Sequence, residues 1–123
     1  MLPKRIPKTP KRATRWRSQA HLNWIRGFVC CVCGSATNIV PAHVRLGSNT
    51  GIGQKPDDWR VVPLCDGRWA SADGALGCHN RQHTVGEATF WADKDVDALL
   101  QDFGAASPRA AEIRRVKAER LAG

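Results

Sequence analysis

The sequence predicts a small α+β fold whose short strands and helices need more than their own packing to stay together. Three observations support this class: two β-prone segments lie in the middle of the chain, helix-prone segments flank them, and cysteines recur beside both. The 123 residues suit one domain. With three Phe and no Tyr its core should be modest, so we expect another source of stability, such as a bound ion.

The first expected element is a short helix within residues 15–28, "RWRSQAHLNWIRGF". Apolar residues recur there at every fourth position, which is typical of one face of a helix. The predicted face consists of Trp16, Ala20, Trp24 and Phe28, and the helix should end near Gly27. The two tryptophans could stack on nucleic acid, but this spacing favours the core.

The expected strands come next, in the Gly- and Pro-rich stretch of residues 29–83. They are "NIVPAHV" (38–44) and "WRVVPLC" (59–65), separated by a polar glycine-rich loop, "GSNTGIGQKPDD" (47–58). A short helix should then begin after Cys78 and carry "HNRQHTVGEATFW" (79–91).

The last third of the chain predicts two more helices. "DVDALLQDFG" (95–104) reads as amphipathic, with Gly104 as its stop. Its inward side chains should be Val96, Leu99, Leu100 and Phe103. After a Ser-Pro entry, "SPRAAEIRRVKAERLAG" (107–123) predicts a basic helix that could contact DNA, bind a partner or remain solvated.

Basic residues are concentrated at the N-terminus and suggest nucleic acid as a partner. Nineteen basic and eleven acidic residues give a net charge of +8. Seven basic residues and no acid lie in residues 1–17, a proline-punctuated segment suited to a phosphate backbone. These candidate nucleic-acid contacts are Lys4, Arg5, Lys8, Lys11, Arg12, Arg15 and Arg17. The alternative is a solubilising terminus.

These patterns predict a flexible basic arm (1–14), a central domain (15–104) and a basic C-terminal helix (105–123). No apolar run approaches the ~20 residues of a membrane span, and no apolar segment follows the basic N-terminus. We therefore expect a cytoplasmic protein that binds DNA and no membrane.

The cysteines predict a structural zinc site. Cys30 and Cys33 form a C-x2-C pair followed by Gly34, and Cys65 and Cys78 supply a second, more widely spaced pair. Four thiolates around one ion make a closed tetrahedral zinc site, whereas disulfides are rare in the cytoplasm. Cys31 could replace Cys30 as a ligand, and the alternative to zinc is a set of unrelated buried thiols.

A second metal-binding pattern follows the last cysteine. His79 and His83 lie four residues apart on the expected helix, so both imidazoles should point to the same side. The alternative is a chance pair of surface histidines. Because Cys78 would fix the start of this helix, we favour a second metal site.

Together these motifs, "CxxCG", "PAHVR", "KPDDWRVVPLC" and "CHNRQH", resemble the HNH (ββα-metal) endonucleases, especially a small phage and prophage branch. The resemblance covers roughly residues 28–91. It implies a zinc-stabilised ββα-metal core with flanking helices. If the chain is phage-encoded, its compartment would be the bacterial host's cytoplasm.

The resemblance also implies roles for individual residues. His43 would be the general base that activates water, and Asp58 would orient it by hydrogen bonding. His79 and His83 would bind the catalytic divalent ion. A neutral histidine with a pKa near ~6.5 is a reasonable base at pH 7, and Arg45, two residues beyond His43 on the same strand face, could clamp a phosphate.

One position departs from the family pattern. Many HNH enzymes carry an Asp ligand directly before the first motif histidine, where this chain has Ala42. The catalytic ion, whether Mg²⁺, Mn²⁺ or a transition metal, would then be held mainly by imidazoles, which suit a transition metal better than Mg²⁺.

The expected function is a metal-dependent DNA endonuclease or nickase of low intrinsic sequence specificity, acting in phage-type DNA processing or recombination. A recombination or packaging protein could be its partner. The main alternative is a catalytically inactive, zinc-stabilised DNA-binding or recombination accessory module. A thiol redox or metal-sensor protein would leave the histidines and the basic arm unexplained.

Overall fold

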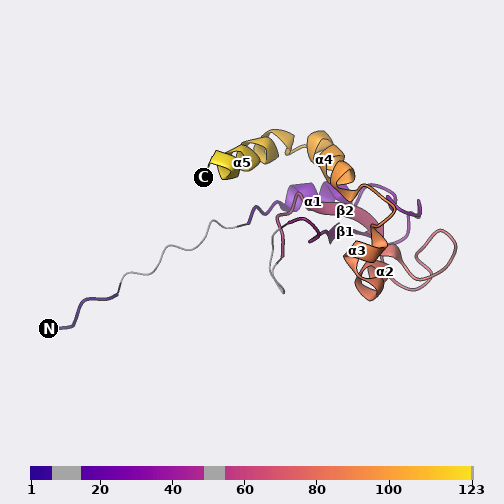
Figure 1. Ribbon diagram of the computed structural model, residues 1–123, viewed down its shortest axis with the longest axis horizontal. Coiled ribbons are helices and arrows are strands. Elements are labelled where there is room, and N and C mark those ends of the chain that lie inside the picture. Colours follow the sequence, from indigo (N-terminus) through magenta and orange to yellow (C-terminus); the bar gives the residue numbers. More distant parts are fainter. Residues whose placement is uncertain (7–14, 49–54, 123) are drawn as a thin grey trace.

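The computed structural model describes residues 1–6, 15–48 and 55–122, and its centre is a two-stranded antiparallel sheet (Figure 1). The strands are β1 (Ile39–His43) and β2 (Val61–Cys65). The helices are α1 (Gln19–Ile25), α2 (Cys78–Val85), α3 (Glu87–Phe90), α4 (Val96–Ala106) and α5 (Ala110–Ala122). In Figure 1 the sheet lies between α4 and α5 on one side and α2 and α3 on the other. The predicted α+β class is confirmed.

The register of the sheet determines which side chains are available for function. Ile39 pairs with Cys65, and His43 pairs with Val61. Because side chains alternate across a strand, Ala42 and Val44 enter the core while His43 points to the opposite face. Both expected strands are therefore present, and the first, expected over residues 38–44, ends at His43.

Two buried clusters surround the sheet. The larger one joins the cysteine region to α4, and its members are Cys30, Ala42, Val44, Val62, Leu64, Cys65, Ala70, Cys78, Trp91, Val96 and Leu100. The smaller one consists of Trp16, Trp59 and Ile113, with Val116 packed against it. Few of these side chains are large, which agrees with the modest core expected from the composition.

The predicted inner face of the first helix is wrong. The helix begins only at Gln19, because the Ser18 side chain accepts a hydrogen bond from the His21 amide and caps the helix there. Its buried residues are His21 and Ile25, and Ala20 is exposed. Trp16 is buried but precedes the helix.

Glycine also acts differently from the prediction at two positions. Gly86, with φ +88°, separates α2 from α3, so the expected single helix after Cys78 is divided. Gly104 does not stop the next helix, since α4 continues to Ala106 and Gly104 is buried within it. Of the predicted inward residues, Val96 and Leu100 are buried, and Leu99 and Phe103 are partly buried.

The basic helix α5 is attached to the segment that precedes α1. The Trp16 indole donates a hydrogen bond to Glu112 (2.9 Å), and Ile113 packs with Trp16 and Trp59 in the smaller cluster. The Arg120 guanidinium pairs with the buried Asp57 carboxylate. The apolar side of this helix therefore faces the body of the protein.

Within the described part of the chain, no helix is both long and apolar enough to cross a membrane.

Candidate functional site

The four predicted zinc ligands come together in the structure. The Sγ atoms of Cys30, Cys33, Cys65 and Cys78 all lie within 4.8 Å of one another. Those of Cys33 and Cys65 are 3.6 Å apart. A metal–sulfur distance of about 2.3 Å places tetrahedral ligands about 3.8 Å apart, so this cluster has the dimensions and chemistry of a structural zinc site.

The first cysteine pair is positioned by a tight turn. The Gly34 amide donates to the Cys30 carbonyl (2.9 Å), and the Cys30 amide donates to the Ser35 carbonyl (2.8 Å). Gly34 has φ +82°, a conformation that favours glycine. The turn leaves the Cys30 and Cys33 side chains on the same side.

The second pair is positioned by regular structure, because Cys65 ends β2 and Cys78 begins α2. The Cys78 amide donates to the Cys65 sulfur at 3.3 Å. Between them, a Cβ on Gly77 would lie 2.6 Å from the Cys65 carbonyl oxygen, so only glycine permits this approach. The unusually long spacing of the second pair therefore still produces a closed site.

Cys31 does not belong to the cluster. Among the described residues, the group that could hold a metal contains Cys30 instead. Burial and the neighbouring Cys30 raise the pKa of the Cys31 thiol to about 12, which keeps it protonated. Burial also raises the pKa of Cys33, but hydrogen bonds from the backbone of Ser35 and Ala72 outweigh it, and the net pKa is about 7. Cys33 is therefore suited to be a thiolate ligand.

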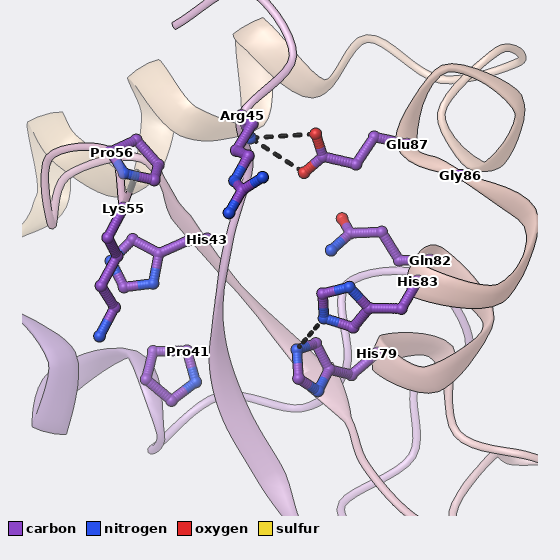
Figure 2. Close-up of a pocket in the computed structure, with 10 residues that line it drawn as sticks. All are labelled: Pro41, His43, Arg45, Lys55, Pro56, His79, Gln82, His83, Gly86 and Glu87. Carbon is purple, nitrogen blue, oxygen red and sulfur yellow. Dashed lines mark hydrogen bonds between the residues drawn. The ribbon is translucent and has the colours of Figure 1, made fainter. Parts of the chain in front are cut away.

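A cleft of about 530 Å³ lies beside the sheet, on the face opposite the core (Figure 2). One wall carries His43 and Arg45 from the end of β1, together with Lys55. The other wall carries His79 and His83 from α2. The remaining lining residues are Pro41, Pro56, Gln82, Gly86 and Glu87. All three predicted functional histidines thus face one cavity.

His43 is hydrogen-bonded to Asp58, the residue expected to orient it. Its Nε2 lies 2.9 Å from Asp58 Oδ1, and the Asp58 side chain is only 4% exposed. The carboxylate also accepts hydrogen bonds from the Ser18 amide (2.8 Å) and the Arg17 guanidinium (3.1 Å), so its position is fixed. Burial lowers the pKa of His43 despite the opposing effect of Asp58. His43 is therefore neutral at pH 7, with Nδ1 available as an acceptor.

His79 and His83 lie side by side on one face of α2. Their Nε2 atoms are 3.1 Å apart, close enough for a single ion to bind both. The Nδ1 atom of His79 lies 3.0 Å from Asp66 Oδ1. A carboxylate on one imidazole nitrogen is a common way to orient the other toward a metal. This donor set fits a divalent ion whose other ligands would be water or substrate oxygens.

The three histidines do not converge on one point. In the described ranges, the four cysteines are the one group of three or more metal-binding side chains whose ligand atoms all lie close together. His43 stands on the opposite wall from the histidine pair (Figure 2). Ala42, the residue directly before His43, is buried in the core cluster (1% exposed) and supplies no ligand to the cleft. The cleft thus separates His43 from the His79–His83 pair.

Three functional candidates escaped sequence reasoning. Asp66 contacts His79, and the Glu87 carboxylate accepts hydrogen bonds from the Arg45 and Leu46 amides, which joins α3 to the end of β1. Gln82 is 1% exposed, and its Oε1 accepts a hydrogen bond from the Trp91 indole (2.7 Å). Two features of the sequence could have indicated these roles. Asp66 directly follows Cys65, and Gln82 lies three residues after His79.

The predicted cationic residues have different surroundings. Arg17 pairs with Asp58, and Arg15 lies 4.0 Å from Asp57, so both have partners within the protein. Arg45 lies on the cleft wall beside His43, as the strand spacing predicted. Lys4 and Arg5 are exposed. The predicted contacts Lys8, Lys11 and Arg12 lie outside the described residues, as does half of the predicted loop at 47–58.

The comparisons with known proteins identify a family without a known activity. No curated protein and no solved structure matches the chain. The family described as protein of unknown function (DUF968) matches residues 2–85, which is more than half of the chain and includes all four clustered cysteines and the cleft histidines. The chain belongs to this DUF968 family.

Proposed function

We propose that this protein is a metal-dependent DNA endonuclease or nickase of the HNH (ββα-metal) type. The observation that carries the proposal is the cleft itself, where a neutral, carboxylate-bound His43 faces the His79–His83 pair. Two strands followed by a helix, with a cysteine cluster suited to zinc at their junction, agree with the order of elements expected of this type of nuclease.

The residues of the cleft suit phosphodiester hydrolysis. His43 Nε2–H donates to Asp58, so Nδ1 can take a proton from an attacking water. Asp58 stabilises the imidazolium that results. Arg45 and Lys55, on the same wall, can bind the oxygens of the scissile or a neighbouring phosphate. A divalent ion held by His79 and His83 would supply neutralisation of the phosphate and of the leaving 3′ oxygen.

Gln82 adds a hydrogen-bond donor to this site. Because an indole N–H can only donate, its bond to Oε1 orients the Gln82 amide with Nε2 on the other side. Nε2 is buried and has no hydrogen-bond partner among the described residues. A buried donor without an acceptor is costly, and a phosphate oxygen in the cleft would satisfy it.

The basic N-terminal segment would give salt-sensitive affinity for the DNA backbone without sequence readout. Such an enzyme would act where DNA is accessible in the cytoplasm. A recombination or packaging protein would then supply the specificity that the cleft lacks.

Nicking of supercoiled plasmid tests the proposal. Desalted protein would be given Mg²⁺, Mn²⁺, Co²⁺ or Ni²⁺ in turn, with His79→Ala and His83→Ala beside Thr84→Ala, a control on the same helix. We expect ion-dependent nicking that either histidine substitution reduces at least tenfold and the control leaves intact.

The second candidate function is a non-catalytic, zinc-stabilised DNA-binding or recombination accessory module. The core position of Ala42 favours it, since β1 then supplies no carboxylate ligand to the cleft. Salt-sensitive DNA binding without nicking in any of the four ions would support this candidate and contradict the nuclease.

A further inference from the structure

The loop between the second pair of cysteines carries an unusual tryptophan. We name residues 66–77 the inter-cysteine loop. Trp69 in this loop is 77% exposed, whereas Trp16, Trp59 and Trp91 are at most 7% exposed and Trp24 is half-buried. No ring contact or hydrogen bond within the described part of the chain involves its side chain.

The backbone of Trp69 is strained as well as exposed. Its φ of +65° lies in the left-handed region, which a bulky residue rarely adopts. Such strain persists only where the surrounding structure enforces it, and it is concentrated at functional sites. A glycine at this position would remove the strain, so neither packing nor backbone geometry explains the tryptophan.

The backbone of the loop around Trp69 is constrained at both ends. The loop begins after Cys65 and ends before Cys78, two members of the cysteine cluster. The Gly67 amide donates to the Asn80 side chain (2.7 Å), and the Gly77 amide donates to the Gly67 carbonyl (2.9 Å). Because the backbone that carries Trp69 is already ordered, binding would not require the loop to order.

The surroundings of the ring define what it can bind. Trp69, Leu76 and Arg68 line an open groove of about 290 Å³ that contains one cation and no carboxylate. The carboxylate of Asp73 is occupied within the loop by the Ala75 amide (3.0 Å) and the Ser71 hydroxyl. An exposed indole beside a guanidinium suits one flat base and the phosphate next to it.

We infer that Trp69 stacks on an unpaired nucleobase and that Arg68 contacts the adjacent phosphate. Base–aromatic stacking combined with nearby cations is how proteins bind single strands without sequence preference. The site lies close to the cleft, because Asp66, which contacts His79, is three residues away and about 11 Å at most along the chain. The preferred substrate would therefore contain a single-stranded or flipped-out base.

The inference rests on the nucleic-acid binding of the proposed function but not on catalysis. Its test is equilibrium binding of fluorescein-labelled 20-nucleotide single strands, the matching duplex and a single strand with abasic sites, without added divalent ion. The variants are Trp69→Gly, which relieves the backbone, Trp69→Phe, which retains an aromatic ring, and Leu121→Ala, a control at another exposed apolar residue.

We expect Trp69→Gly to weaken single-strand binding about 5- to 150-fold, Trp69→Phe to weaken it less, and the control to leave it unchanged. Duplex affinity should change less than twofold, and the effect should disappear on the abasic strand. Trp69→Gly should unfold at the same or a higher temperature, since glycine adopts this φ without strain.

Unchanged single-strand binding by Trp69→Gly, or an equal loss on duplex and abasic DNA, would overturn the stacking site. If wild-type protein still nicked plasmid in that case, the proposed function would stand while this inference failed. If wild-type protein bound no DNA of any form, both would fail.

Discussion

At the scale of single residues, the proposed function depends on how His43 is held. Asp58 receives hydrogen bonds from His43, Arg17 and the Ser18 amide, so one buried carboxylate links His43 to the segment before α1. An imidazole that acts as a base needs a fixed ring and the neutral form. Burial favours the neutral form of His43 by lowering its pKa.

This arrangement predicts the pH dependence of cleavage. A base acts when unprotonated, so the rate should fall as the pH drops through the pKa of His43, which lies below 6.5. Asp58 raises that pKa, and Asp58→Asn should therefore move the acid limb to lower pH while reducing the rate at its plateau. Nicking rates between pH 4.5 and 8 would measure both effects.

The exposed Asp102 offers a control of equal charge. Asp102→Asn should leave the acid limb in place. An acid limb that moved to higher pH in Asp58→Asn would contradict the assignment of His43 and Asp58.

Gln82 provides a second prediction at this scale. Gln82→Glu keeps an acceptor for the Trp91 indole but replaces the N–H donor with an anionic oxygen in the cleft. We expect at least a tenfold lower kcat/KM, because the carboxylate repels the phosphate, and a smaller loss in Gln82→Met. Steady-state nicking kinetics would measure it, and equal kcat/KM in wild type and Gln82→Glu would exclude contact with the phosphate.

At the scale of elements, the attachment of α5 depends on one buried carboxylate. Asp57 pairs with Arg120 and accepts a hydrogen bond from the Trp16 amide (2.7 Å). The guanidinium of Arg120 also lies 5.0 Å from the Trp59 ring. The helix is therefore joined to the same segment that positions Asp58.

Asp57→Ala should lower the free energy of unfolding by about 2–3 kcal/mol, because it removes the carboxylate that pairs with Arg120 and leaves the buried Trp16 amide without its acceptor. The matched control is Glu119→Ala, which removes an exposed carboxylate from α5 and should cost less than about 0.5 kcal/mol. Urea unfolding followed by tryptophan fluorescence would measure both. Equal losses in the two variants would show that the Asp57 contacts do not stabilise the helix.

Local signals in the sequence predicted the elements better than their faces. Both strands and the start of α2 were evident, because β-prone residues and a cysteine ligand mark them. The inner face of α1 was not, since a side-chain cap at Ser18 delays the helix and His21 rather than Ala20 is buried. Gly104 resembled a stop but lies within α4.

The site followed the same rule. The cysteine cluster and the histidine pair could be predicted, because each is encoded by short spacing along the chain. The contacts of Asp66 with His79, of Gln82 with Trp91 and of Arg17 with Asp58 join residues of different segments. Such contacts depend on tertiary geometry that no local pattern carries.

At the scale of the whole molecule, the cysteine cluster should decide whether the chain folds. It connects the turn at Cys30 to β2 and α2, and it lies within the larger buried cluster. Zinc bound to four cysteines can contribute about 10–16 kcal/mol of apparent binding energy, which exceeds the stability of a typical small domain.

Two neighbouring cysteines provide a matched test. Cys33→Ser should lose the zinc and the cooperative unfolding transition, because one ligand of the cluster is missing. Cys31→Ser should retain one zinc ion per chain, since Cys31 lies outside the cluster. Metal analysis with circular dichroism would measure both, and loss of zinc in Cys31→Ser would contradict the assigned ligand set.

The central claim is that this fold presents His43 as a base to a phosphate beside a metal bound by His79 and His83. The most direct measurement is the rate of plasmid nicking by His43→Ala relative to wild type, with zinc content and thermal unfolding measured on the same samples. The account predicts a loss of about 100-fold or more, with zinc content and folding unchanged and partial recovery when free imidazole is added. Equal nicking by the two proteins would contradict it.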